Sequence, residues 1–248
     1  MGTPSHQTAS PVQTGRVLVV AALGRELAAL KRGANSDSNL VLLETGEGAA
    51  NAERSVGASL DAEMPRAVLS IGFAGALSQL LQEGDLLVAS ECRSISNGVF
   101  EASPGLLEAA RRIQGDAAVA RFGVTLMVDD VVCQAEGKSR LATTLGHDVI
   151  GCVDMESSAV ARVCAERGVP FLSARCITDL FTEDLPVDFN RCRRADGTIS
   201  NWKVLALALR RPASFKALLE LRRRSVVCSE KLATFVRRLV AEIARSSG

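Results

Sequence analysis

The residues best suited to chemistry in this chain are carboxylates that stand at the ends of predicted strands. Residues 149–153 form a short apolar run, and Asp154 and Glu156 open a helical segment directly after it. A second apolar run, residues 171–177, leads to Asp179. We interpret this part of the chain as strand, helix and strand in a parallel crossover, which would bring both strand ends to one edge of a sheet. The pattern therefore predicts that the three carboxylates line a single pocket.

Carboxylates must carry any acid–base chemistry here. The chain has two histidines, and one of them, His6, lies in a polar N-terminal stretch. A carboxylate directly after a buried strand costs free energy unless it is paired or used. Partial burial would favour the protonated form of Asp179 and suit it to proton donation near neutral pH. Glu26 and Glu156 also have a plainer interpretation, as acids near helix N-termini that the helix dipole favours.

The segments that must position these carboxylates alternate between strands and helices. We predict strands at residues 17–23, 40–43, 67–71, 86–89, 124–128 and 131–133. We predict helices at residues 25–30, 49–60 and 104–113. This alternation is typical of an α/β fold with a largely buried sheet.

Two glycine-rich segments follow predicted strands. They are residues 46–48 and 72–75, and glycine there would let the backbone amides bind a sugar or an anion. Neither segment matches the dinucleotide-binding pattern G-x-G-x-x-G or a phosphate-binding loop. An ordinary glycine turn at a strand end remains the alternative for both.

Length and composition favour one large domain. The chain has 248 residues, and we expect a disordered leader at 1–15 and a single domain at 16–248. No apolar run approaches the roughly 18–20 residues of a membrane span. Seven scattered cysteines with no C-x-x-C pair indicate a reduced, cytoplasmic setting without a disulfide framework. We expect no metal site.

The C-terminal part differs from the rest in charge. From Arg191 onward there are 14 Lys or Arg and 4 Asp or Glu, so this part carries +10 and the remainder −9. Leucines and phenylalanines recur there at helical spacing and predict two amphipathic helices broken near Pro212. The basic helices either present a solvated face while they pack on the sheet, or form a surface for acidic partners or anionic lipid. No nucleic-acid recognition motif is present.

Four motifs together resemble the purine nucleoside phosphorylase and nucleosidase superfamily, most closely the methylthioadenosine/S-adenosylhomocysteine nucleosidases. They are Gly72-Phe73-Ala74-Gly75, Asp154-Met155-Glu156-Ser157, Val169-Pro170-Phe171 and Arg175-Cys176-Ile177-Thr178-Asp179. The resemblance implies a three-layer α/β fold with a mixed central sheet flanked by helices. It also implies a homodimer that acts on a small purine nucleoside without a metal or cofactor, with phosphate as the one possible co-substrate.

The resemblance also implies roles for individual residues. Asp179 would protonate N7 of the leaving purine, and Glu26 would activate the attacking water. The remaining implied contacts are with substrate: Met155 and Glu156 at the ribose, Phe73, Ala74 and Gly75 beside the ribose and the nucleophile, and Val131, Val132, Cys133 and Thr178 around the base. Cleavage through an oxocarbenium-like sugar needs one group to assist the leaving base and another to assist the nucleophile.

Departures from the family pattern leave alternatives open. Val132 replaces the phenylalanine that typically stacks near the purine. Arg25 lies near where phosphorylases carry a phosphate-binding arginine, whereas Ser70 stands where many of them carry another. Hydrolysis is therefore favoured, and phosphorolysis stays open. The tail looks more like that of hopanoid-associated phosphorylases, which would suit a lipid-linked nucleoside and peripheral membrane contact. A non-catalytic nucleoside-binding protein is the alternative of another class.

Overall fold

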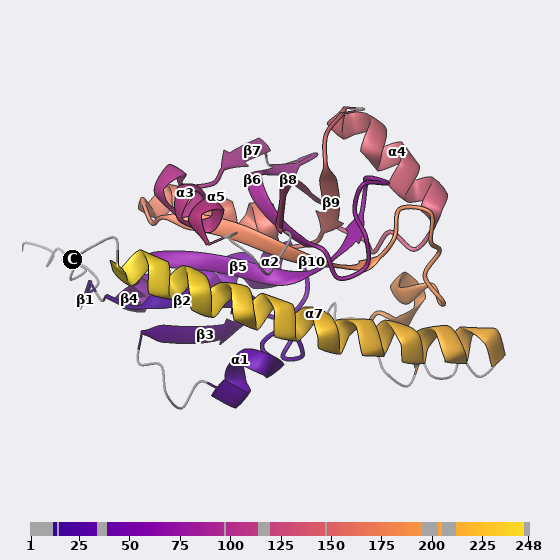
Figure 1. Ribbon diagram of the computed structural model, residues 1–248, viewed down its shortest axis with the longest axis horizontal. Helices are drawn as coiled ribbons and strands as arrows, with labels where there is room; N and C mark the ends of the chain where they lie inside the picture. Colours follow the sequence, from indigo (N-terminus) through magenta and orange to yellow (C-terminus); the bar gives the residue numbers. More distant parts are fainter. Residues whose placement is uncertain are drawn as a thin grey trace, which may run out of the picture.

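The central feature of the structure is an eight-stranded mixed sheet with helices on both faces (Figure 1). The computed structural model describes residues 12–13, 15–33, 39–96, 98–113, 120–146, 148–194, 203–204 and 212–245. Alternate residues of the strands belong to two apolar clusters, one against each helix layer. The α/β fold with a mixed central sheet, flanked by helices, is confirmed.

Five strands of the sheet close into a ring. In the described part of the chain the order is β10, β6, β8, β9, β5, β2 and β3, with β7 on β6, and β10 also pairs with β5. The ring β5, β10, β6, β8 and β9 resembles a small barrel, from which β2 and β3 extend. The strands are β2 (Val17–Ala21), β3 (Leu40–Glu44), β5 (Ala67–Ala76), β6 (Leu86–Ser94), β7 (Gly98–Glu101), β8 (Ala120–Met127), β9 (Gly151–Asp154) and β10 (Phe171–Asp179).

The helices form two layers. On one face, α2 (Ala49–Ala62) and α5 (Ser157–Arg167) bury apolar side chains against the sheet. On the other face lie α1 (Ala28–Gly33), α3 (Pro104–Arg112) and the long α7 (Pro212–Arg245), which crosses the front of Figure 1. Beside the ring, α4 (Ala135–Leu145) packs on β8 and β9. The short 3-10 helix η2 (Phe189–Cys192) follows β10.

Most predicted elements are present, and three differ in ways that matter for the site. The predicted strand at 67–71 continues through the glycines to Ala76, so residues 72–75 are strand and not a loop. The predicted helix at 25–30 starts only at Ala28, because residues 24–26 form a turn. Residues 131–133 are irregular and do not form a strand.

The segment from β9 to β10 is strand, helix and strand as predicted, but the expected parallel crossover is wrong. β10 runs parallel to β5, whereas β9 runs antiparallel to it. Local patterns specify an extended or helical segment but not its direction relative to neighbours. The two strand ends nevertheless meet at one residue, since Gly75 pairs with both Val153 and Asp179.

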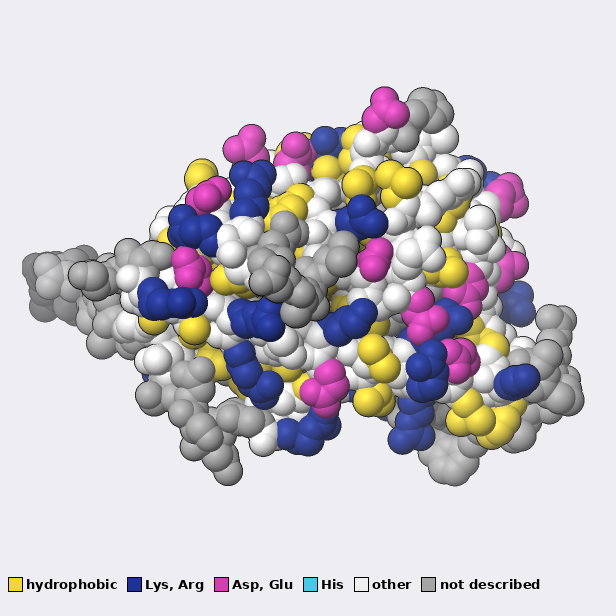
Figure 2. Space-filling view, in the orientation of Figure 1, with side chains coloured by type: hydrophobic (Ala, Val, Ile, Leu, Met, Phe, Trp, Pro, Cys, Tyr) yellow, Lys and Arg dark blue, Asp and Glu magenta, His cyan; other side chains and the backbone are white. Residues whose placement is uncertain are grey.

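The C-terminal helix α7 belongs to the core. Its apolar residues, which include Leu232, Val236 and Leu239, are buried against the sheet. Pro212 is the first residue of α7, and the helix predicted before it falls on residues 205–211, outside the described part. Lys and Arg side chains are spread over the face that α7 presents, with acidic side chains between them (Figure 2).

The predicted leader lies mostly outside the described residues. Residues 1–11 and 14 are not described. The strand β1 (Val12–Gln13) pairs in parallel with β4 (Glu63–Met64), as a small sheet separate from the main one.

Candidate active site

A pocket lies beside the middle of β5, where the neighbouring parallel strands β2 and β3 end. Such strand ends are the usual ligand sites of α/β sheets. Its walls come from β2, the segment after β3, β5, the start of α5, and β10. The polar and aromatic groups that line it are Glu26, Thr45, Ser70, Phe73, Glu156 and Arg175.

Glu26 reaches this pocket from the turn between β2 and α1. Its side chain is buried, and its carboxylate accepts the N–H groups of Leu23 and Phe73, each at 2.8 Å. These two hydrogen bonds stabilise the turn, so α1 begins only at Ala28. Burial raises the pKa of Glu26 above the usual glutamate value, although the two N–H groups and Arg175 oppose the rise. Such a carboxylate can accept a proton near neutral pH.

Glu156 enters the same pocket from the residue before α5. Its Oε1 accepts the N–H of Gly48 at 2.7 Å. Burial raises the pKa of Glu156 to about 8, with Asp154 and Glu26 adding to the rise. The glycine turn at residues 46–48 was expected to offer amides to a sugar or anion, but its Gly48 amide holds this carboxylate.

A buried ion pair lies next to the two glutamates. Arg175, only 2% exposed, places Nε and one terminal nitrogen 2.6 Å from Oδ2 of Asp154. The remaining N–H groups bind Ser70 O, Ser70 Oγ and Ala174 O at 2.9–3.1 Å. Four N–H groups of the guanidinium thus donate hydrogen bonds within the protein, in addition to the ion-pair contact with Asp154. The expectation that Asp154, Glu156 and Asp179 line a single pocket is wrong: of the three, Glu156 alone lines this one. Asp154 faces Arg175 and the start of α5.

Asp179 lies farther along β10, four residues beyond Arg175. Its side chain is almost fully buried, and Oδ1 accepts the hydroxyl of Thr178 at 3.0 Å. Oδ2 lies 2.6 Å from Nζ of Lys138, whose side chain is completely buried. The site thus holds Asp179 in an ion pair. This environment differs from the partly apolar one that the sequence suggested.

The glycines of residues 72–75 make room for carboxylates. A Cβ on Gly72 would lie 2.9 Å from Oε1 of Glu26. A Cβ on Gly75 would lie 2.8 Å from Oδ2 of Asp179. The two catalytic candidates therefore sit against β5 three residues apart, about 10 Å along the strand.

A model of the phosphorylase superfamily matches residues 28–195, which contain the ring, Glu156, Arg175 and Asp179. The chain belongs to the phosphorylase superfamily. This confirms the resemblance carried by the four motifs.

Two relatives of this chain are named as nucleosidases. The 5′-methylthioadenosine/S-adenosylhomocysteine nucleosidase of Shewanella oneidensis is 27% identical over 179 residues, covering 64% of this chain and 74% of that enzyme. The enzyme of the same name from Staphylococcus aureus is 23% identical over 188 residues, covering 69% and 82%.

Solved structures show the same superfamily fold. A mutant of the Helicobacter pylori nucleosidase with 5′-methylthioadenosine in the active site has a TM-score of 0.72 at 19% identity, covering 92% of this chain and 99% of that one. Futalosine hydrolase of Helicobacter pylori strain 26695 has a TM-score of 0.71 at 19% identity, covering 96% and 100%. At these identities the agreement is one of fold.

Other residues expected in a phosphorylase-superfamily site have mixed positions. Phe73 lines the pocket, and the exposed Arg25 places its guanidinium 6.0 Å from the Phe73 ring centroid instead of lining the pocket. The Met155 sulfur accepts an N–H of Arg193 at 3.6 Å. Ala74 is buried, and its carbonyl lies 3.4 Å from the Thr178 hydroxyl.

The segment expected at the purine edge is partly engaged. The N–H and C=O of Val131 both bind the side-chain amide of Asn190, at 3.0 and 2.9 Å. Cys133 donates its thiol to Val131 O, and its own carbonyl accepts the N–H of Leu185. Val132 packs at the edge of the apolar cluster around α4. In this structure the Val131 groups are therefore not free for a base, contrary to expectation.

Two buried cations of the site escaped the sequence interpretation. Arg175 interrupts an otherwise apolar strand, which is itself a signal because an isolated buried charge is costly. Lys138 stands with Leu141, Ala142 and Leu145 at i, i+3, i+4 and i+7, on the inward stripe of α4. A lysine in that stripe was the available clue.

The described residues contain neither a cluster of metal ligands nor a helix that could span a membrane. Among them, no group of three or more His, Cys, Asp or Glu side chains could hold a metal ion. No helix in the same residues is long and apolar enough to cross a membrane.

Proposed function

We propose that this chain hydrolyses the N-glycosidic bond of an adenosine-type purine nucleoside, with or without a 5′ substituent such as that of methylthioadenosine or S-adenosylhomocysteine. The observation that carries the proposal is the pocket that the buried Glu26 and the half-buried Glu156 both line within a phosphorylase-superfamily fold. The relatives named methylthioadenosine/S-adenosylhomocysteine nucleosidase support this substrate class.

The arrangement divides the reaction between two positions on β5, Gly72 and Gly75. At the Gly72 end, Glu26 takes a proton from the attacking water, which its raised pKa favours. At the Gly75 end, Asp179 faces the leaving base. Gly72 and Gly75, against which the two carboxylates pack, lie three residues apart on β5, about 10 Å along the strand. Glu156 binds the ribose hydroxyls and, when ionised, stabilises the developing positive charge on the sugar.

The charges of the pocket favour water over phosphate as the nucleophile. Arg175 is the cation that lines the pocket, and its N–H groups already bind Asp154, Ser70 and Ala174. A phosphate dianion would enter a site whose acidic groups, Glu26 and Glu156, repel it when they are ionised. Phosphorolysis would need Arg25 to turn from the Phe73 ring into the pocket.

An assay of products tests the proposal. The protein is incubated with methylthioadenosine, adenosylhomocysteine, adenosine and inosine, with and without phosphate, and the sugar product is identified by mass spectrometry. We expect a free sugar in both conditions, and loss of base release in Glu26→Gln and Asp179→Asn. Glu108→Gln, on the exposed face of α3, is the matched control and should retain activity. A phosphate-dependent sugar 1-phosphate would establish phosphorolysis, and tight binding without base release would establish a binding protein.

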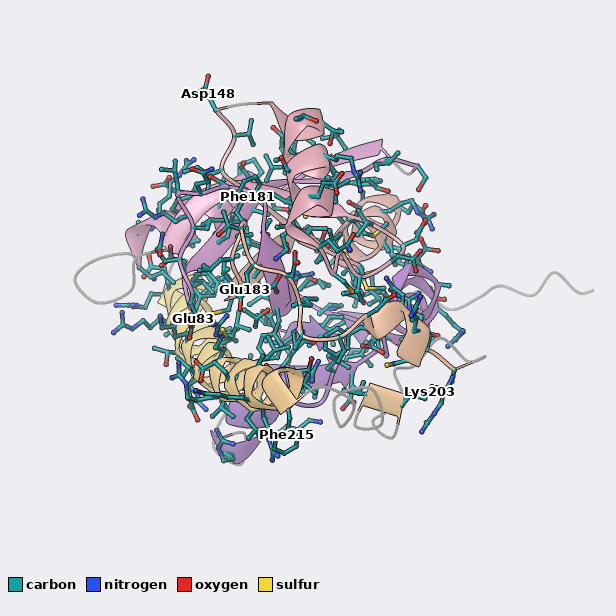
Figure 3. The ribbon with its side chains drawn as sticks, turned by 90° about the vertical axis from the view of Figure 1, so that its right-hand side faces the viewer. Glu83, Asp148, Phe181, Glu183, Lys203 and Phe215 are labelled. Carbon is teal, nitrogen blue, oxygen red and sulfur yellow. The ribbon has the colours of Figure 1, made fainter. Side chains whose placement is uncertain are left out.

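A second proposal concerns the N-terminal half of α7, as a peripheral contact with anionic lipid. Phe215, Leu219 and Val226 are 43%, 52% and 56% exposed and lie along one side of the helix, with Arg222 and Arg223 beside them. Phe215 lies at the lower edge of the molecule in Figure 3. An apolar strip flanked by arginines suits a lipid surface. Sedimentation with phosphatidylglycerol vesicles, but not phosphatidylcholine vesicles, would support it, and loss of sedimentation in Leu219→Ser would locate it.

A third proposal is the homodimer that the resemblance implies. The β6–β7 hairpin exposes Ile95 by 74% and Val99 by 59%, which offers an apolar surface for a second copy. Analytical ultracentrifugation should show a dimer that Ile95→Ser weakens, and a monomeric wild-type protein would contradict the proposal.

A further inference from the structure

The ammonium group of Lys138 is buried and has three acceptors for its three N–H groups. Nζ donates to Leu180 O at 2.7 Å and to Glu183 O at 2.9 Å, and it lies 2.6 Å from Oδ2 of Asp179. A buried ammonium costs several kcal/mol unless it is paired and hydrogen-bonded, and here it is both. Lys138 thus joins α4 to the end of β10 and to the loop that follows.

The loop that receives Lys138 is held from the other side by α7. Arg224 donates to the Glu183 carboxylate at 2.7 and 3.0 Å and to Thr178 O at 3.2 Å. The same carboxylate accepts the N–H of Leu180 at 3.2 Å. Figure 3 shows Glu183 between the loop and α7. The Lys138–Asp179 pair is therefore fixed from both sides, so its short distance is a built feature of the fold.

This pairing changes how the proton for the leaving base must be stored. Beside an ammonium group, a carboxylate is favoured in its ionised form. A neutral Asp179 waiting for substrate is therefore not the resting state that the structure supports. The proton nearest to Asp179 is instead one on Lys138.

We propose that Lys138 is a positioning residue that holds the Asp179 carboxylate and keeps one transferable proton at the base end of the site. This inference rests on the proposed nucleoside cleavage and specifies its acid. When the N-glycosidic bond breaks, its electron pair goes to the base. An N–H bond of Lys138 breaks, the proton passes to Asp179, and the O–H bond so formed breaks as the proton binds the base nitrogen.

The structure accommodates both ends of that transfer. The neutral amine left on Lys138 has two N–H groups, and two carbonyl acceptors, Leu180 O and Glu183 O, are in place for them. Asp179 remains a carboxylate before and after the step. Water returns the proton to the amine once the base has left.

The test compares Lys138→Met with the wild-type protein from pH 5 to pH 8.5, using whichever nucleoside of the panel the wild type cleaves fastest. At pH 8 we expect kcat to fall at least 100-fold, with KM changed only a few-fold. The ratio of variant to wild-type kcat/KM should then rise at least tenfold toward pH 5, because without Lys138 the Asp179 carboxyl must take its own proton from solvent. Dividing by the wild type cancels titrations that both proteins share.

Other groups near Asp179 keep their partners in the variant. Three titratable or charged groups face Asp179 or the loop after β10. They are Cys133 from the segment before α4, Glu183 from the loop and Arg224 from α7. Lys138→Arg retains a cation and should keep a wild-type pH profile at reduced rate. Lys216→Met, an exposed lysine near the start of α7, is the matched lysine control and should behave as wild type.

Thermal unfolding establishes whether each variant is folded. If Lys138→Met does not fold, the rate and pH profile of Lys138→Arg test the role of Lys138 instead. A ratio that is flat with pH, or a variant within fivefold of wild type at pH 8, overturns the role of Lys138 alone. A wild type that cleaves none of the nucleosides overturns the proposed function as well, so the two failures are distinguishable.

Discussion

Substitution of Gly72 by alanine should disturb one carboxylate and little else. The backbone at Gly72 is ordinary strand, so alanine fits its conformation. The new Cβ would lie 2.9 Å from Oε1 of Glu26, whereas ordinary contacts begin at 3.4 Å. The carboxylate must therefore retreat by about 0.5 Å from a position that the Leu23 and Phe73 N–H groups define. Overpacking of this kind costs about 1–3 kcal/mol, and displacements of up to 1 Å can lower catalysis by about 100-fold.

A cycle of four proteins measures this effect: wild type, Gly72→Ala, Glu26→Ala and the double variant. Urea unfolding should show the loss of about 1–3 kcal/mol for alanine at position 72 when Glu26 is present. That loss should largely disappear in the Glu26→Ala background, because the colliding carboxylate is gone. The kcat/KM of Gly72→Ala should fall by up to about 100-fold. Gly105→Ala, where nothing lies within 4 Å of the new Cβ, is the matched control.

Equal stability losses in the two backgrounds would refute this reasoning, because the glycine would then serve the backbone and not the carboxylate. Wild-type kcat/KM in a folded Gly72→Ala protein would refute the role of the Glu26 position in water activation. Neither result could be attributed to general loss of the fold if Gly105→Ala remains stable.

Three further predictions follow from the buried charges of the site. The folded-state pKa of Glu156, about 8, exceeds the unfolded value of 4.5. Its contribution to stability is therefore present below pH 4.5 and is lost as the pH rises to 8. Urea unfolding midpoints at pH 5 and pH 8 should show this decline, and Glu156→Gln should make the decline smaller. Arg175→Met leaves Asp154 as an unpaired buried charge and should destabilise by about 3–5 kcal/mol, more than the double variant Arg175→Met/Asp154→Asn, in urea unfolding. Burial raises the pKa of Cys152 to about 12, so iodoacetamide at pH 8 should alkylate it only after unfolding, as peptide mass spectrometry would show.

The fold was predictable because its strands are buried runs of apolar residues. The segments that became β2 and β10 have this pattern, and Gly168 ends α5 with a φ of 65° as its position suggested. Strand pairing was not predictable, since direction and neighbours depend on contacts far apart in the chain. The glycines at 72–75 were assigned to a loop because glycine is common in turns. Glycine within a strand can instead mark a close approach by another group.

The acidic residues of the candidate site could be predicted from the sequence, but the groups with which they interact could not. The sequence points to Glu26, Asp179 and Glu156. Their respective partners, Phe73, Lys138 and Gly48, lie between 41 and 108 residues away along the chain. Those partners decide the state of each acid. No spacing rule connects positions that meet only when β5, β10 and α4 have packed.

The buried cations explain why the four acids of the site differ in chemistry. Asp154 is paired with Arg175 and Asp179 with Lys138, each at 2.6 Å, whereas Glu26 and Glu156 are held by backbone N–H groups. Burial raises the pKa of both glutamates, which suits them to proton exchange. Asp179 then acts as one half of an ion pair that already contains a proton. The clue in the sequence was the position of each cation, in the middle of an apolar strand and on the inward stripe of a helix, where a charge is stable only with a partner.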